Sequence, residues 1–198
     1  MKIIGITGGV GAGKTEVLKL IAGMCDCVIV TADRLARSLE QKGEVCYEPL
    51  VELLGKEVLG DDKEIDAAKM SKMIFADGAE DILAAVNGIV HPAVKRRILE
   101  MIDEEAKKGT EYFFIEAALL IEDHYDTIVD EMWYIYADED IRRKRLKDSR
   151  GYSDSKIDEI FASQNSDETF RRYCSAVIDN SGSIEDTKIQ LAELFDVR

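Results

Sequence analysis

Proline and glycine are scarce in this chain. Only 2 prolines and 14 glycines occur among 198 residues, which excludes a collagen-like or low-complexity protein. No apolar run reaches the roughly 18 residues that a membrane-spanning helix requires. The apolar stretch at the N-terminus, Met1–Gly5, is shorter than the hydrophobic region of a signal peptide. We therefore expect a globular, cytoplasmic protein with no membrane partner.

Basic residues are outnumbered by acidic ones. The chain has 26 lysines and arginines against 40 aspartates and glutamates, which gives a formal net charge of −14. A surface this acidic repels the phosphate backbone of nucleic acids. We therefore expect no nucleic-acid partner. As a separate expectation, the protein is a monomer.

Histidine and cysteine are also few. The chain contains 2 histidines and 4 cysteines, and only Cys25 and Cys27 lie close together in sequence. A structural zinc site needs four such ligands, usually in paired spacings. The pattern favours reduced thiols that act as small core residues.

Short apolar segments alternate with longer segments of helical period. Each apolar segment is a continuous run, which is typical of a strand buried on both faces of a parallel sheet. A helix is predicted after the first strand, at Glu16–Met24. Strands separated by helices predict a three-layer α/β/α fold with a five-stranded parallel sheet, because right-handed crossovers place helices on both faces. The predicted strands are Lys2–Thr7, Cys27–Val30, Tyr112–Ile115, Met132–Ala137 and Ala176–Ile178.

One stretch interrupts this alternation. About residues 43–90 carry helical patterns at Tyr47–Leu54 and Ala67–Phe75, and no clear strand. We interpret the stretch as a helical insertion within a single domain that spans residues 1–198.

A long helix is predicted to follow the insertion. His91 and Pro92 would start it, because proline is tolerated in the first turn, where its missing N–H group has no partner to lose. The helical pattern continues to about Lys108, and Gly109 is predicted to end it.

A glycine-rich segment separates the first strand from its helix. Residues 8–15 read G-G-V-G-A-G-K-T and fit the pattern G-x-x-x-x-G-K-[ST]. The glycines let backbone N–H groups point at phosphate oxygens, and the following helix adds its positive N-terminal end. Lys14 would contact the β- and γ-phosphates, and the Thr15 hydroxyl would bind Mg²⁺. The strand–loop–helix context predicts a P-loop NTPase or kinase. Its predicted ATP-binding residues are Gly8, Gly9, Gly11, Ala12, Gly13, Lys14 and Thr15.

Two acidic residues follow predicted strands. Ligands of open α/β sheets bind at the carboxyl ends of the strands, where Asp33 and Glu116 occur. Asp33 would act as a general base on an acceptor hydroxyl or hold Mg²⁺ through water; alternatively, it caps the helix Arg34–Leu39. Glu116 would hold Mg²⁺ or its waters, or it is a solvated strand end.

Basic residues concentrate in one helical segment. Arg142–Arg150 contains six basic residues and one aspartate. On an acidic protein this predicts a local anion site, such as a mobile lid over phosphates at about residues 140–165. The alternative is a solvated helix face paired with neighbouring acids.

Several further motifs occur in an order typical of one kinase family, and they cover nearly the whole chain. They are Ile6–Thr15, Ala32-Asp33, Ile65-Asp66, Ile74–Asp77, Asn87–Pro92, Leu119–Glu122, Ala162–Gln164 and Val177–Gly182. On these residues the chain resembles the dephospho-CoA kinases, whereas the glycine-rich loop alone would indicate only a P-loop NTPase.

The resemblance implies an activity and a set of site residues. The activity is ATP-dependent phosphorylation of the 3′-hydroxyl of dephospho-CoA, the last step of coenzyme A synthesis. The ATP phosphates would be surrounded by Gly11–Glu16, and Lys14 would neutralise charge in the transition state. Asp33 would be the catalytic carboxylate and Arg145 the lid arginine, while Val177–Gly182 would lie near the adenine. The helical insertion at about residues 43–90 would be the substrate-binding region.

The chain departs from the family's pattern at several positions. The usual D-A-D is Thr31-Ala32-Asp33, and Glu16 stands where a second serine or threonine is usual. Ala118 replaces a proline, and the second arginine of R-L-x-x-R-D is displaced by one position, to Arg150. Two other functions therefore stay open: another P-loop kinase that acts on a small molecule or nucleotide, and a nucleotide-binding module without catalysis.

Overall fold

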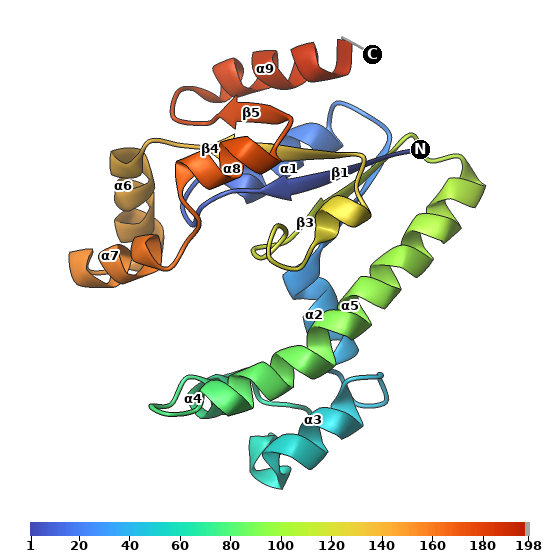
Figure 1. The fold of residues 1–198 in the computed structure, drawn as a ribbon, viewed down its shortest axis with the longest axis vertical. Coiled ribbons are helices and arrows are strands. Elements are labelled where there is room, and N and C mark those ends of the chain that lie inside the picture. The colour runs from blue at the N-terminus through green and yellow to red at the C-terminus, as the bar shows by residue number, and fades with distance from the viewer. Residues whose placement is uncertain (197–198) are drawn as a thin grey trace. The chain divides into compact units, whose positions relative to one another are not determined.

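The structure is a computed structural model that describes residues 1–196, and it contains a five-stranded parallel sheet. The strand order is β2-β3-β1-β4-β5 (Figure 1). All five predicted strands are present, and the predicted α/β fold is confirmed. The strands are β1 (Lys2–Thr7), β2 (Cys27–Thr31), β3 (Tyr112–Glu116), β4 (Glu131–Tyr136) and β5 (Ala176–Asp179).

The chain divides into two compact units. The first unit comprises Met1–Ile29 and the chain from Glu105 onward, and the second is Val30–Glu104. The second unit is helical and contains the predicted insertion, but it extends beyond that insertion in both directions. The helices are α1 (Lys14–Ala22), α2 (Ala32–Leu39), α3 (Tyr47–Leu54), α4 (Ala67–Ile74), α5 (Glu80–Lys108), α6 (Glu139–Arg150), α7 (Asp154–Ala162), α8 (Asp167–Tyr173) and α9 (Ile184–Asp196), with 3₁₀ turns η1 (Lys56–Val58) and η2 (Tyr125–Thr127).

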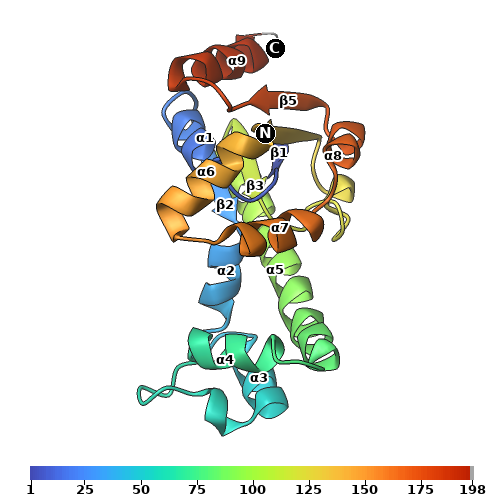
Figure 2. The same cartoon turned by 90° about the vertical axis from the view of Figure 1, so that its left-hand side faces the viewer.

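One face of the sheet buries an aromatic and aliphatic core. The register pairs Ile4 with Phe114 and Ile6 with Trp133, so these four side chains share a face, and all are fully buried. The rings of Phe114 and Trp133 lie edge to face at 5.7 Å, a favourable aromatic geometry. Helices α1 and α9 lie on this side of the sheet (Figure 2) and supply Val17, Leu18, Ile21 and Leu191 to the core.

The opposite face is covered by α8 and by the segment after β3. Phe170 of α8 stacks on Tyr134 of β4, with ring centroids 4.7 Å apart. Gly5 faces Leu120, and a Cβ on Gly5 would lie only 2.8 Å from the Leu120 side chain. Both faces of the sheet are therefore packed, as the continuous apolar strands predicted.

Helix α5 begins earlier than the sequence predicted. It runs from Glu80 through Pro92 to Lys108, so the prediction that His91 and Pro92 start the helix was wrong, while its end before Gly109 is confirmed. An internal proline pushes against the carbonyl four residues back, which here belongs to Gly88. Figure 1 shows that α5 is bent, and an internal proline is a common cause of such a bend. Neither α5 nor any other helix within residues 1–196 has an apolar stretch long enough to cross a membrane.

We expect Phe114→Ala to lower the free energy of unfolding by about 3–5 kcal/mol, because it leaves a cavity beside a tightly packed ring. Trp133 is the single tryptophan, so its fluorescence during denaturant unfolding reports on this contact. The control is Leu119→Ala, since Leu119 is 43% exposed and should lose less than about 1 kcal/mol. Equal losses in the two variants would contradict the core described here.

Candidate active site

The glycine-rich segment forms the loop between β1 and α1, and two of its glycines have conformations that other residues rarely adopt. Gly8 has φ 150°, and a Cβ there would lie 2.4 Å from the carbonyl oxygen of Ile135. Gly13 has φ 91°, and its Cβ would lie 2.4 Å from the side-chain nitrogen of Asn180. Because α1 starts at Lys14, two residues earlier than predicted, the loop leads directly into a helix N-terminus. The N–H groups and the positive dipole end at a helix N-terminus attract anions.

Lys14 folds back over this loop. Its Nζ donates a hydrogen bond to the carbonyl oxygen of Gly8 at 2.8 Å and lies 3.7 Å from the carboxylate of Glu116. Glu116 ends β3, next to Ile6 of β1 in the sheet register. Both side chains are largely buried, with exposed fractions of 16% and 17%. The structure thus brings together two residues that the sequence predicted for the site.

Asn180 fixes the far end of the loop from a buried position. Its Nδ2 donates to the carbonyl oxygen of Ala12 at 2.7 Å, and its Oδ1 accepts from the Thr187 hydroxyl at 3.0 Å. The backbone N–H of Asn180 also donates to Tyr136 in β4 at 2.8 Å. Sequence reasoning missed this role, although a polar residue directly after an apolar strand was the available indication.

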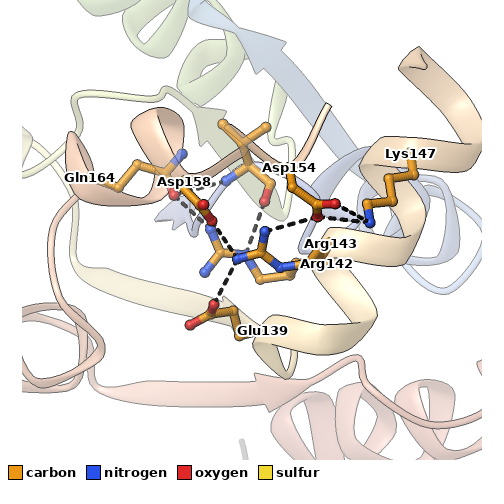
Figure 3. A network of polar contacts seen from close by, with 8 residues as sticks. Glu139, Arg142, Arg143, Lys147, Asp154, Asp158 and Gln164 are labelled. Carbon is orange, nitrogen blue, oxygen red and sulfur yellow. Dashed lines mark hydrogen bonds and ion pairs between the residues drawn. The ribbon is translucent and has the colours of Figure 1, made fainter. Parts of the chain in front are cut away.

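Arg145 contacts the same part of the loop from α6. Its Nη1 donates to the carbonyl oxygens of Ala12 at 3.2 Å and Gly11 at 3.5 Å, and its Nη2 donates to that of Asn180 at 2.8 Å. The predicted lid arginine therefore lies at the loop. Arg142 and Gln164 also reach the loop, at Val10 (Figure 3), and neither was singled out from the sequence for this contact.

Other basic residues of α6 face acids instead. Arg143 is paired with Glu139, Asp154 and Asp158 at 2.7–3.3 Å (Figure 3). Hydrogen bonding to Asp158 and Glu139 raises the pKa of Arg143 above its ordinary value. Lys147 donates to Asp154 and lowers the pKa of that carboxyl. For these two basic residues the alternative of a helix face paired with acids holds.

Two cavities adjoin the loop within the first unit. The larger, about 510 Å³, lies at the α1 end, and a smaller one of about 200 Å³ lies at the β1 end. The larger is lined by Gly13, Glu16, Lys19, Leu20, Arg145, Asn180, Gly182 and Ile184. The smaller is lined by the loop, by residues 118, 119 and 122, and by Ser163, Gln164, Asn165 and Phe170.

Asp33 belongs to the second unit and is exposed in the first turn of α2. The N-cap of α2 is Thr31, whose side chain makes no capping hydrogen bond, so the alternative that Asp33 caps this helix was wrong. The Thr31 hydroxyl oxygen is buried and has no hydrogen-bond partner among residues 1–196.

A parallel sheet whose first strand leads through a glycine loop into a helix defines a P-loop protein with the fold of small-molecule kinases. Shikimate kinase from Bacteroides thetaiotaomicron shares this fold, with a TM-score of 0.53 at 12% identity. A solved structure from Thermus thermophilus is more similar, with a TM-score of 0.81 at 26% identity over 99% of this chain and 97% of that one.

Sequence comparison identifies the family. The family model for dephospho-CoA kinase matches residues 2–186. The dephospho-CoA kinase of Carboxydothermus hydrogenoformans is 35% identical over 98% of this chain and 93% of its own length. That of Oceanobacillus iheyensis is 34% identical over 96% and 94%. The chain belongs to the dephospho-CoA kinase family, which confirms the resemblance stated from its motifs.

We expect Asn180→Ala to weaken both folding and nucleotide binding. The change removes one hydrogen bond each from Ala12 and Thr187, which keep their bonds to Arg145 and Ser183. Such a loss costs about 0.5–1.5 kcal/mol per bond, and it loosens the end of the loop. Thermal unfolding and ADP titration of the same protein measure the two effects. Thr187→Val is the comparison, because it removes the hydrogen bond to Asn180 without touching the loop. If both variants bind ADP as the unsubstituted protein does, Asn180 does not shape the loop.

Proposed function

We propose that this chain transfers the γ-phosphoryl group of ATP to the 3′-hydroxyl of dephospho-CoA, giving coenzyme A and ADP. The match to the dephospho-CoA kinase family over residues 2–186 carries this proposal. The site supports it, because Lys14, Glu116 and Arg145 all lie at one glycine-rich loop. Such a loop meets the main needs of phosphoryl transfer, which are positioning and charge neutralisation.

ATP fits the loop and the cavity beside it. The backbone N–H groups around Gly13 and the start of α1 would receive the phosphates. The larger cavity would take the adenosine, since it offers apolar contacts from Leu20 and Ile184 beside the polar groups of Asn180. This agrees with the expectation that Val177–Gly182 lies near the adenine. Glu16 lines the same cavity and forms an ion pair with Lys19 at 3.0 Å.

The donor set also fits Mg²⁺. The Thr15 hydroxyl is exposed in the first turn of α1 and makes no hydrogen bond within residues 1–196, and Glu116 provides a carboxylate near Lys14. The described part of the chain contains no group of three or more candidate metal-ligating side chains. Mg²⁺ in kinases is commonly bound by one or two protein oxygens, substrate phosphates and water, and Thr15 and Glu116 would be those protein ligands. When bound, the ion neutralises charge on the β- and γ-phosphates.

The remaining roles fall to three side chains. Asp33 would accept the proton of the 3′-hydroxyl, because Thr31 has no carboxylate to act as a base. Lys14 and Arg145 would stabilise the negative charge on the phosphoryl group during transfer. Closure of a lid at about residues 140–165 would exclude water, which otherwise competes with the acceptor.

A coupled assay of ADP release tests the proposal. Purified protein would be given MgATP with dephospho-CoA and, separately, with nucleoside monophosphates or shikimate. We expect turnover with dephospho-CoA and a product phosphorylated at the 3′-oxygen. Preferential turnover of another acceptor would identify a different P-loop kinase, and ATP binding without turnover would identify a module without catalysis.

We expect Lys14→Ala to lower kcat by about 10²-fold or more, the effect of removing one preorganised electrostatic group. Steady-state assay of the folded variant measures this. Lys144→Ala is the matched control, because Lys144 is an exposed lysine of α6 and its loss should leave kcat unchanged. Near-normal turnover in Lys14→Ala would overturn the assignment of the loop.

We expect Asp33→Asn to reduce transfer to dephospho-CoA by about 10²–10⁴-fold, the usual contribution of a general base, while ATP affinity is retained. Turnover and nucleotide titration on the same preparation separate the two quantities. Asp61→Asn, an exposed carboxylate of the same unit, should behave like the unsubstituted enzyme. Full activity in Asp33→Asn would make Glu116 the leading candidate for the base.

A further inference from the structure

Helix α6 presents two kinds of arginine. Arg143 faces three carboxylates, as described above. Within residues 1–196, Arg142 and Arg145 donate hydrogen bonds only to neutral oxygens. One of these oxygens is in the Gln164 side chain, and the others are backbone oxygens of the glycine-rich loop and of Asn180. These two arginines are three residues apart, so they lie on one face of the helix. That face is the one that meets the loop.

Arg142 forms a closed ring of hydrogen bonds with Val10 and Gln164. Its Nε donates to the carbonyl oxygen of Val10 at 2.9 Å, and its Nη2 donates to the Oε1 of Gln164 at 2.7 Å. The same Oε1 accepts the backbone N–H of Val10 at 3.3 Å (Figure 3). Both polar groups of one loop residue are therefore bound by side chains from outside the loop. We call these three residues the Val10 clamp.

The surroundings leave the guanidinium little freedom. Its central carbon lies 4.2 Å from the ring centre of Phe161 in α7, a stacking distance for a cation over an aromatic ring. Gly9 is also close to the guanidinium, since a Cβ on Gly9 would lie 2.5 Å from the guanidinium carbon. Any residue other than glycine at that position would displace Arg142.

The position of Arg142 also bears on a departure from the family's pattern. The second arginine of R-L-x-x-R-D would occupy position 149, which is Ser149 here, and its hydroxyl donates to the carbonyl oxygen of Arg145. The displaced Arg150 is exposed and lies 5.8 Å from the ring centre of Tyr152. Arg142 is thus the other arginine of α6, besides Arg145, that the structure places at the loop.

We propose that Arg142 and Gln164 are positioning residues for phosphoryl transfer, which hold the glycine-rich loop in its phosphate-binding shape through Val10. A loop built mainly of glycine has many conformations, and fixing one before the nucleotide arrives lowers the entropy cost of binding. The clamp joins the loop to α6 and to the linker between α7 and α8, so the lid segments and the loop are ordered together. The inference rests on the proposed function for its reaction, but its effect on nucleotide binding is independent of the acceptor.

Two measurements test the clamp: the affinity for MgADP and the kcat of phosphoryl transfer. Both are made on Arg142→Ala, Gln164→Ala and the double variant. We expect each single change to weaken MgADP binding by about tenfold, the order of one charge-assisted hydrogen bond, and to lower kcat as well. Because either change opens the same ring of hydrogen bonds, the double variant should bind MgADP no more weakly than the single variant with the lower affinity. Arg142→Lys should resemble Arg142→Ala, since one ammonium group cannot reproduce the two directed bonds of the guanidinium.

Arg143→Ala is the matched control, because it removes a neighbouring arginine of the same helix that does not contact the loop. It should leave MgADP affinity within twofold of the unsubstituted protein, even if its melting temperature falls. Three results would overturn the proposal: equal affinities in Arg142→Ala and Arg143→Ala, additive losses in the double variant, or full affinity in Arg142→Lys. If Arg142→Ala does not fold, Gln164→Ala gives the same test from the other side of the ring. Inactivity toward dephospho-CoA in the unsubstituted protein would contradict the proposed function and leave the binding test intact.

Discussion

A glycine-rich loop has almost no side chains with which to hold its own shape, and this constraint organises the site. Its carbonyl groups are held by neighbours instead: Gly8 by Lys14, Val10 by Arg142, and Ala12 by Asn180 and Arg145. Each of these contacts is a hydrogen bond from a side chain to a backbone oxygen of the loop. The shape of the loop therefore depends on side chains from three separate parts of the chain: Lys14 of α1, Arg142 and Arg145 of α6, and Asn180 after β5.

The strand order explains how residues so distant in sequence reach one loop. β4 lies beside β1, and β5 lies beside β4, so the segments that follow these strands begin at the edge of the sheet where the loop starts. α6 follows β4 and brings the arginines, while the segment after β5 brings Asn180. This is the reason that parallel sheets bind ligands at the carboxyl ends of their strands.

The sequence predicted the strands and the loop well, because both depend on local pattern: apolar runs for the strands, and glycine spacing between a strand and a helix for the loop. Prediction from the sequence failed where the structure of a residue depends on contacts with residues distant in sequence. Pro92 has a local preference for a helix start, yet it lies inside α5. In the sequence, Asn180 is simply a polar residue that follows a strand. Only the fold brings its side chain within hydrogen-bond distance of the Ala12 carbonyl oxygen. In the basic run, Arg142 and Arg143 are adjacent and chemically identical, and only the direction of each side chain separates a loop contact from a surface ion pair.

Thr31 stands at the position where the first aspartate of the D-A-D pattern is usual. Its hydroxyl oxygen is buried without a hydrogen-bond partner in residues 1–196, a modest cost for a neutral group. A carboxylate oxygen buried in the same way would cost far more unless a cation lay beside it. Threonine thus removes the need for a permanent counter-charge at the end of β2. Asp33, which is exposed in the first turn of α2, carries its charge in water at no such cost, so the chain can lose the first acid of the pair and retain the second.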